Sequence, residues 1–151
     1  MQTSKQLSVT LANKPGRLAN VLSALTKEKV HCLALSVMNG GDRGLLRIVP
    51  DNLATATEVL EKQNIHYEAT DVLLAPVPSQ NGALSKVCER LAAEHLNIDY
   101  VYCAPDTHGK NKGGSLLVIK VNDLAKAQRI LSETGGTTKR KLPGRRPVHA
   151  R

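Results

Sequence analysis

The chain has 151 residues, of which 41% are hydrophobic, and it contains no Phe, no Trp and only three Tyr. Its core must therefore be built from aliphatic side chains. The net charge of +8 is unevenly spread, because residues 134–151 hold six cations and no acid. The remaining residues carry 15 cations and 13 acids. This near-neutral balance excludes a protein whose whole folded surface is strongly basic.

The sequence also lacks the features of membrane-spanning and secreted proteins. Its longest apolar run, residues 72–77, contains Pro76 and is far shorter than the roughly 20 residues that cross a bilayer. The three cysteines are widely spaced and odd in number, and no apolar signal segment follows Met1. We therefore expect a cytoplasmic protein.

Hydrophobic periodicity predicts the elements of the first half. Leu7, Val9 and Leu11 alternate with polar residues, as in a half-buried strand, and Pro15-Gly16 then breaks the pattern. In chain order the sequence predicts a strand, a helix, two strands joined by a glycine-rich turn, a helix and a strand, over residues 7–11, 17–27, 31–38, 45–49, 53–60 and 65–74.

The second half repeats the first. Gly16, Leu18 and Leu25 match residues 66 positions later, whereas Leu53 and Leu60 match residues 71 positions later. The second copy therefore has five extra residues in one loop, and the repeat sets the architecture. Its strand, helix, two strands and helix are predicted over residues 72–77, 84–92, 98–103, 116–121 and 124–131, with a last strand at 137–142.

The order βαββαβ, present twice, predicts an α+β fold of two tandem ferredoxin-like units, with antiparallel sheets and helices on one face. No turn signal separates residues 67 and 77, so we expect one long strand that both units share. The predicted units are residues 1–71 and 72–135. Residues 136–151 are expected to be a disordered basic tail.

Three short motifs resemble the ACT domain, a small amino-acid-binding regulatory module. They are Asn13-Lys-Pro-Gly-Arg-Leu between the first strand and helix, Thr70-Asp-Val-Leu, and Glu94-His-Leu-Asn-Ile before a second strand. The resemblance covers residues 5–133 and is to free-standing tandem ACT proteins. It implies a non-catalytic regulator, most simply a homodimer, that binds a small amino acid at the interface between its two ACT units.

The resemblance also implies the site residues. In the family, a loop Asn and an Asn at the start of the second strand, often from opposite units, hold one ligand. Here these are Asn13 and Asn97, so the implied site comprises Asn13, Lys14, Pro15, Gly16, Arg17, Leu18, Asn97 and Ile98. The second site is degraded, because other residues replace the motif at His31, Ser79 and Asn81 beside Gly82.

Physical chemistry supports this choice of loop. The first turn of a helix has unpaired N–H groups and the positive end of the helix dipole, which suit a ligand α-carboxylate. An Asn side chain offers both a donor and an acceptor to an amino acid. Pro15 stiffens the loop, and Gly16 permits a close approach to the backbone. Alternatively, Pro15-Gly16 is only a good turn, and Asn97 only a loop cap.

Several alternatives stay open. The chain could be a regulatory subunit of an amino-acid biosynthetic enzyme. A nucleic-acid-binding role through the basic tail is less favoured, because RNA-recognition domains stack bases on aromatic side chains and residues 45–49 have none. Tyr100 and Tyr102 share one strand face and form either a ligand wall or packing. No histidine spacing indicates a metal, no catalytic motif stands out, and no cofactor is expected.

Overall fold

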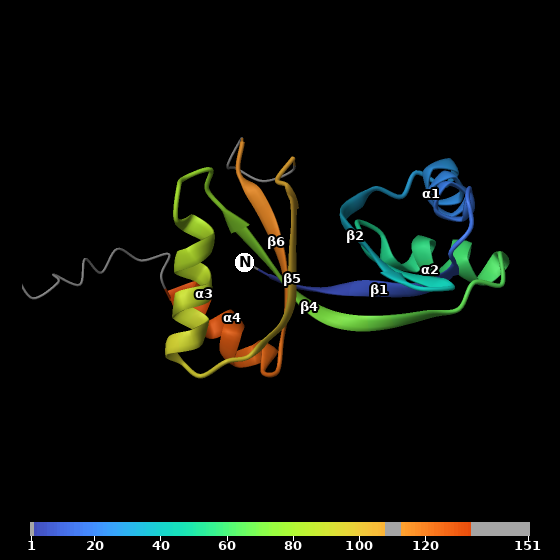
Figure 1. Cartoon of the computed structure of the whole chain (residues 1–151). Helices are drawn as coiled ribbons and strands as arrows, with labels where there is room; N and C mark the ends of the chain where they lie inside the picture. The colour runs from blue at the N-terminus through green and yellow to red at the C-terminus, as the bar shows by residue number, and fades with distance from the viewer. Residues whose placement is uncertain (1, 108–112, 134–151) are drawn as a thin grey trace, which may run out of the picture.

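The computed structural model describes residues 2–107 and 113–133. The first unit has two helices, and the strands around them follow the predicted order (Figure 1). Its elements are β1 (Gln2–Ala12), α1 (Arg17–Lys27), β2 (Cys32–Gly40), β3 (Arg43–Pro50), α2 (Leu53–Lys62) and β4 (Tyr67–Val77). The helix predicted over residues 17–27 and the long strand predicted over 67–77 are both confirmed.

The second unit repeats this order up to its second helix. Its own elements are α3 (Ala83–Ala93), β5 (Ile98–Pro105), β6 (Ser115–Val121) and α4 (Leu124–Ser132). The last strand predicted at residues 137–142 lies outside the described residues. None of the helices in the described part of the chain has the length and hydrophobicity that crossing a bilayer requires.

All strands of the described residues form one antiparallel sheet, in the order β2-β3-β1-β4-β6-β5. The predicted α+β fold with ferredoxin-like units is confirmed, and the two units share β4 as expected. Leu73 shows this directly, because its neighbours across the ladders are Thr3 of β1 on one side and Ile119 of β6 on the other. The central strands therefore belong to both units.

The start of β1 occupies a place that the sequence does not predict. Gln2, Thr3 and Ser4 pair with Leu74, Leu73 and Val72, beside the strands of the second unit. In the first unit the fourth strand, β4, lies beside β1. In the second unit the start of β1 takes that fourth position next to β4. Each unit thus completes its sheet with a strand that the other unit also uses.

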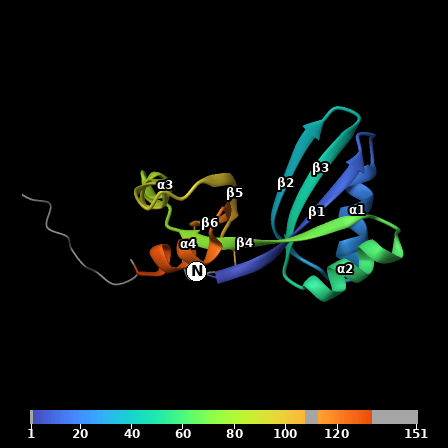
Figure 2. The same ribbon diagram turned by 90° about the horizontal axis from the view of Figure 1, so that it is seen from below.

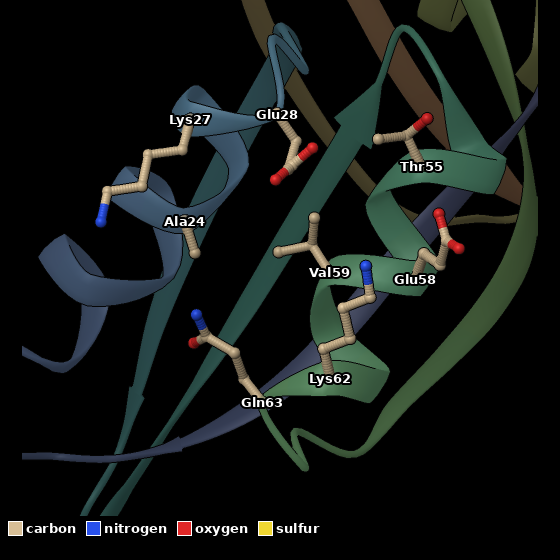
Figure 3. Close-up of a pocket in the computed structure, with 8 residues that line it drawn as sticks. All are labelled: Ala24, Lys27, Glu28, Thr55, Glu58, Val59, Lys62 and Gln63. Carbon is tan, nitrogen blue, oxygen red and sulfur yellow. The ribbon is translucent and has the colours of Figure 1, made fainter.

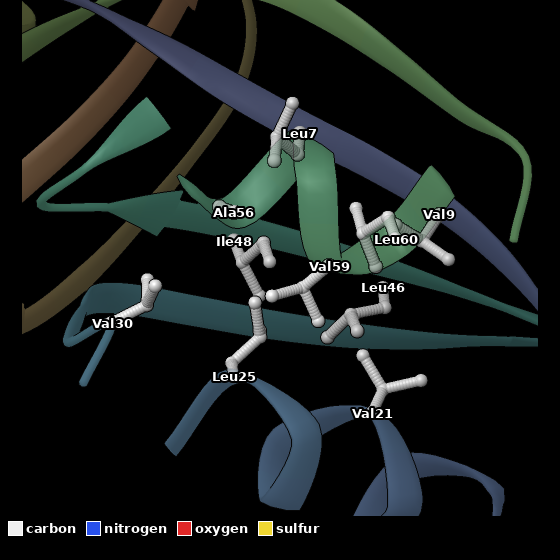
Figure 4. Packing of buried hydrophobic residues seen from close by; sticks show 10 residues of the cluster. All are labelled: Leu7, Val9, Val21, Leu25, Val30, Leu46, Ile48, Ala56, Val59 and Leu60. Atoms are coloured by element: carbon white, nitrogen blue, oxygen red, sulfur yellow. The ribbon is translucent and has the colours of Figure 1, made fainter. Parts of the chain in front are cut away.

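Each helix pair covers its own core on one face of the sheet. The first core joins Leu7 and Val9 of β1 to residues of β3, α1 and α2 (Figure 4). In β4, Tyr67 packs against this first core, whereas Leu73 and Ala75 belong to the second core under α3 and α4. Each unit thus has both helices on one face, as predicted. Because odd-numbered residues of a strand share one face, the two helix pairs also lie on the same face of the common sheet.

The other face of the sheet curls upon itself. A third cluster there joins Val72 and Leu74 of β4 to Ala34 of β2, Val118 of β6 and the flank of Tyr102 in β5. The outer strands β2 and β5, at opposite ends of the strand order, contact one another (Figure 2). The helix-free face is therefore the surface along which the two units pack.

A network of polar side chains lies on this packing surface between the two units. The Gln6 side chain is fully buried. Its Nε2 donates hydrogen bonds to Tyr100 Oη at 2.7 Å and to Ser8 Oγ at 3.3 Å, and its Oε1 accepts one from Tyr102 Oη at 2.7 Å. The guanidinium of Arg47 lies 3.9 Å above the Tyr100 ring. The two tyrosines therefore pack between the units.

The environment of Tyr102 predicts a loss of stability at alkaline pH. Burial, and then the nearby Tyr100, raise the pKa of Tyr102 above its usual value of 10.0. As the pH rises past about 10, the unfolded chain releases this proton while the folded protein keeps it, so unfolding is favoured. We expect the urea midpoint to fall between about pH 9 and pH 11, and to fall less in a Tyr102→Phe variant.

A Tyr67→Phe variant is the matched control. The pKa of Tyr67 is also raised, chiefly by its hydrogen bond to Glu61. This variant should keep the part of the pH dependence that arises from Tyr102. Equal pH dependence in wild type and Tyr102→Phe would contradict the assignment.

Candidate functional site

The loop between β1 and α1 is built by Asn13. Its Nδ2 donates to Gly41 O at 3.0 Å and to Asn39 Oδ1 at 3.5 Å, and its backbone N–H donates to Asp42 O at 2.9 Å. Asn13 therefore ties the loop to the β2–β3 hairpin. Within the described residues, Asn13 Oδ1 accepts no hydrogen bond, so this oxygen is available to a ligand ammonium group.

The amino end of α1 is open. Gly16 is its N-cap, with a left-handed φ of 87° and no side-chain cap. The second unit repeats this geometry at Gly82, with φ 84° and no side-chain cap on α3. Side chains other than glycine are strained in this conformation, so glycine suits both positions.

The other two helices begin differently. The side chain of Asn52 caps α2 by accepting from Thr55 N at 3.1 Å, and Asp123 caps α4 by accepting from Lys126 N at 3.1 Å. Side-chain caps of this kind satisfy the free N–H groups of a first turn. Among the helices of the described residues, only α1 and α3, which follow the ACT-like loops, lack such a cap, so a carboxylate could bind their first turns.

The starts of the second strands have equivalent backbone geometry in the two units. The N–H of His31 donates to Asp51 Oδ1 and its carbonyl accepts from Asp51 N, both at 2.9 Å. Asn97 is held in the same way by Asn122, at 3.1 and 3.3 Å. The Asn97 side chain also donates to Asp99 Oδ1 at 3.0 Å. Next to it, Ile98 pairs in the ladder and packs against the second core.

The structure does not bring Asn13 and Asn97 together within one chain. The loop after β1 lies at the outer end of the first unit, and the α3–β5 turn lies below the second unit in Figure 1 and apart from that loop in Figure 2. The strand ladders show why. Ile98 pairs with Val121 at the end of β6, and Ile119 of the same strand pairs with Leu73, which pairs with Thr3. The start of β5 is therefore level with the first half of β1, whereas Asn13 follows the far end of that strand. A composite site between the two units of one chain is therefore not formed.

A cavity of about 300 Å³ adjoins the loop of the second unit. Ser79 and Asn81 line it together with Leu84 of α3 and Cys103 of β5. The sequence comparison identified this loop as the degraded one, because Ser79 stands where the first unit has Asn13. The space is present here, but the longer amide side chain is not.

Arg17 lines a different cavity, of about 400 Å³, beneath the first turn of α1. Arg43 from the start of β3 and His66 from the α2–β4 turn line it as well. Neither residue belongs to the motifs that indicated the site. The signal that could have found them is the repeat, because Gly114 occupies the position equivalent to Arg43.

A third depression, of about 140 Å³, lies between α1 and α2 (Figure 3). Ala24 and Val59 form its apolar floor. Its rim carries both signs of charge, from Lys27, Glu28, Glu58 and Lys62. These charges offset one another, so the depression has no net charge to select a ligand. In the described residues no group of three or more His, Cys, Asp or Glu side chains could hold a metal ion.

Comparison with known proteins identifies the family. The family model described as ACT domain pair matches residues 2–136. A solved structure of a Bacteroides thetaiotaomicron protein is 32% identical, with a TM-score of 0.79, and the match covers 88% of this chain and 89% of that one. No curated protein matches the sequence with significance.

Two more distant structures share the fold. The ligand-free regulatory subunit of aspartate kinase from Thermus thermophilus is 17% identical, with a TM-score of 0.62, over 87% of this chain and 94% of that one. The corresponding subunit from Thermus flavus is 18% identical, with a TM-score of 0.57, over 90% and 94%. The match of the family model over nearly the whole chain confirms the resemblance found in the motifs: the chain belongs to the family of ACT domain pairs.

Proposed function

We propose that the protein is a non-catalytic regulator that senses a small amino acid at a site shared between two copies of the chain. The observation that carries this proposal is the difference between the helix starts. The helices that follow the ACT-like loops have open first turns, whereas Asn52 and Asp123 cap the other two. A ligand carboxylate would bind the open turn of α1, and Asn13 Oδ1 would accept from the ligand ammonium group.

A second copy would supply the missing half of the site. One chain contributes the loop and first turn, and its partner contributes the α3–β5 turn. The proposed set is Asn13, Lys14, Pro15, Gly16, Arg17 and Leu18 of one chain with Asn97 and Ile98 of the other. The outer strands support such pairing, because β2 and β5 each have one edge without a hydrogen-bonded strand within the described residues. They also expose Val37 (51%) and Val101 (40%).

The pairing of two chains would also form a second site that binds the amino acid more weakly. The loop of the second unit has an open helix start like the first, but it offers Ser79, Asn81 and Gly82. The strand start of the first unit offers His31 in place of an asparagine. Since the helix starts are alike, the side chains at these positions would decide which site binds. We propose one strong site per chain.

Calorimetry with each of the twenty amino acids tests the proposal. One amino acid should bind with one site per chain, and Asn97→Ala should weaken its binding at least about tenfold, because a hydrogen bond to a charged group is lost. Ser79→Ala is the matched control and should leave affinity unchanged. Two equal sites per chain, or full affinity in Asn97→Ala, would contradict the proposal.

A second candidate is that the chain regulates a separate enzyme. The observation that favours it is the match to regulatory subunits of aspartate kinase over 94% of their length. Reconstitution with a catalytic subunit of an amino-acid biosynthetic kinase would test this role. The chain should then change the inhibition of that enzyme by its amino-acid product, and a kinase whose inhibition is unchanged would contradict it.

A further inference from the structure

We propose that the cavity beneath α1 binds a small polyvalent anion, one that carries at least two acidic oxygens. The end of β1, the first turns of α1, the start of β3 and the α2–β4 turn enclose a volume of about 400 Å³. This site lies behind the β1–α1 loop. It shares Arg17 with the proposed amino-acid site but does not rest on that proposal, because Arg43 and His66 take no part in that site.

The charge of the cavity is of one sign. Arg17 and Arg43 bring two permanent cations, and His66 adds an imidazole. No carboxylate lines the cavity. Among the described residues, neither guanidinium forms an ion pair with a carboxylate. A concave site lined by positive charges attracts an anion, and the bound anion reduces the repulsion between those charges.

Guanidinium groups also define the shape of the ligand. Each presents a planar fork of donors that matches two oxygens of a carboxylate or phosphate. The amide side chains of Asn20 and Asn64 line the same cavity and add further donors. An anion with two acidic oxygens therefore offers an acceptor to each arginine, which a monovalent halide does not.

The backbone fixes where these groups stand. Arg43 pairs with Ala12 at the end of the β1–β3 ladder. Asn64 has a left-handed φ of 56°, and its N–H donates to Glu61 O at 3.0 Å. Arg17 begins α1. The two guanidinium groups and the turn that holds Asn64 thus come from separate elements of the fold.

The repeat shows that the fold does not require these charges. Ala83 occupies the position of Arg17 in the second unit, and Gly114 occupies that of Arg43. Both units nevertheless form the same helix start, and a strand follows each hairpin loop. The fold therefore does not require the arginines of the first unit, and anion binding would account for their presence.

Titration followed by amide NMR tests the proposal. Inorganic phosphate and citrate, each added at constant ionic strength against chloride, separate phosphate-like from carboxylate-like ligands. We expect at least one of them to shift the amide signals around Arg43 and His66. Arg43→Gln should raise its dissociation constant about tenfold, because a charge-assisted hydrogen-bond pair is lost. Arg129→Gln, an exposed arginine on α4, is the matched control and should leave it unchanged.

Three outcomes would overturn the proposal: no shift with either anion, shifts confined to residues 134–151, or equal weakening by Arg43→Gln and Arg129→Gln. Replacing these exposed arginines should not disturb the core. Even if a variant unfolds, the amide shift changes of the wild-type protein show where the anion binds. Amino-acid calorimetry on Arg43→Gln should be normal, which distinguishes failure of this site from failure of the proposed sensor.

Discussion

A Leu73→Ala variant is expected to lose about 3–5 kcal/mol of unfolding free energy. Leu73 is fully buried in the second core, and its strand is paired on both sides, to Thr3 and to Ile119. Truncation leaves a cavity that cannot collapse easily, because two neighbouring strands hold the backbone in place. Urea denaturation followed by circular dichroism measures the change.

Because β4 belongs to both units, the Leu73→Ala variant should still unfold in one transition, shifted to lower urea. Leu84→Ala is the control of the same chemistry. Leu84 is 46% exposed on α3, so its truncation should change stability by less than about 0.5 kcal/mol. Two separate transitions, in which the first unit keeps its wild-type midpoint, would contradict a shared strand that couples the units.

Gln6→Leu should destabilise the protein by about 2 kcal/mol, although it replaces a buried polar side chain by an apolar one of similar size. The variant leaves the hydroxyls of Tyr100 and Tyr102 without their Gln6 partner between the two units. A buried polar group deprived of its partner costs about 1–3 kcal/mol. The same urea experiment measures the loss.

Removing the hydroxyls as well should reverse much of that loss. In a Gln6→Leu variant that also carries Tyr100→Phe and Tyr102→Phe, no polar group of the trio remains to be satisfied. We expect at least half of the lost stability to return, because replacing all the partners of a buried hydrogen-bond network by apolar groups can be nearly neutral. If the triple variant loses as much unfolding free energy as the three single variants do in sum, the hydrogen-bond network does not determine the stability of this interface.

Hydrophobic periodicity predicts most of the fold correctly because the aliphatic residues mainly form the buried faces of helices and strands. Val21 and Leu25 recur at helical spacing and are buried under α1, and Leu7 and Val9 alternate and are buried in β1. The first residues of β1 escape this reasoning. Residues 2–6 are all polar, and backbone pairing to β4 makes them a strand. Pairing partners distant in sequence leave no periodic trace.

The candidate site was predictable in its parts but not in its assembly. The motif locates the loop of Asn13 and the strand start of Asn97, and both lie where the repeat places them. Their separation follows from the strand register, which sets the start of β5 level with the first half of β1 and which no local motif reveals. The cavity of Arg43 and His66 joins residues of β1, α1, β3 and the α2–β4 turn, so only the folded chain brings them together.

The exchange of strands between the units means that the protein cannot be dissected at its repeat boundary. Residues 71 and 72 lie in the middle of β4, so cleavage there would divide the strand on which both cores are built. A fragment that begins at residue 67 would keep all of β4 but lose β1, and an open edge is a template for aggregation. Co-expressed fragments would have to find each other to fold. Duplication has thus produced a single folding unit, in which each half needs a strand of the other to complete its sheet.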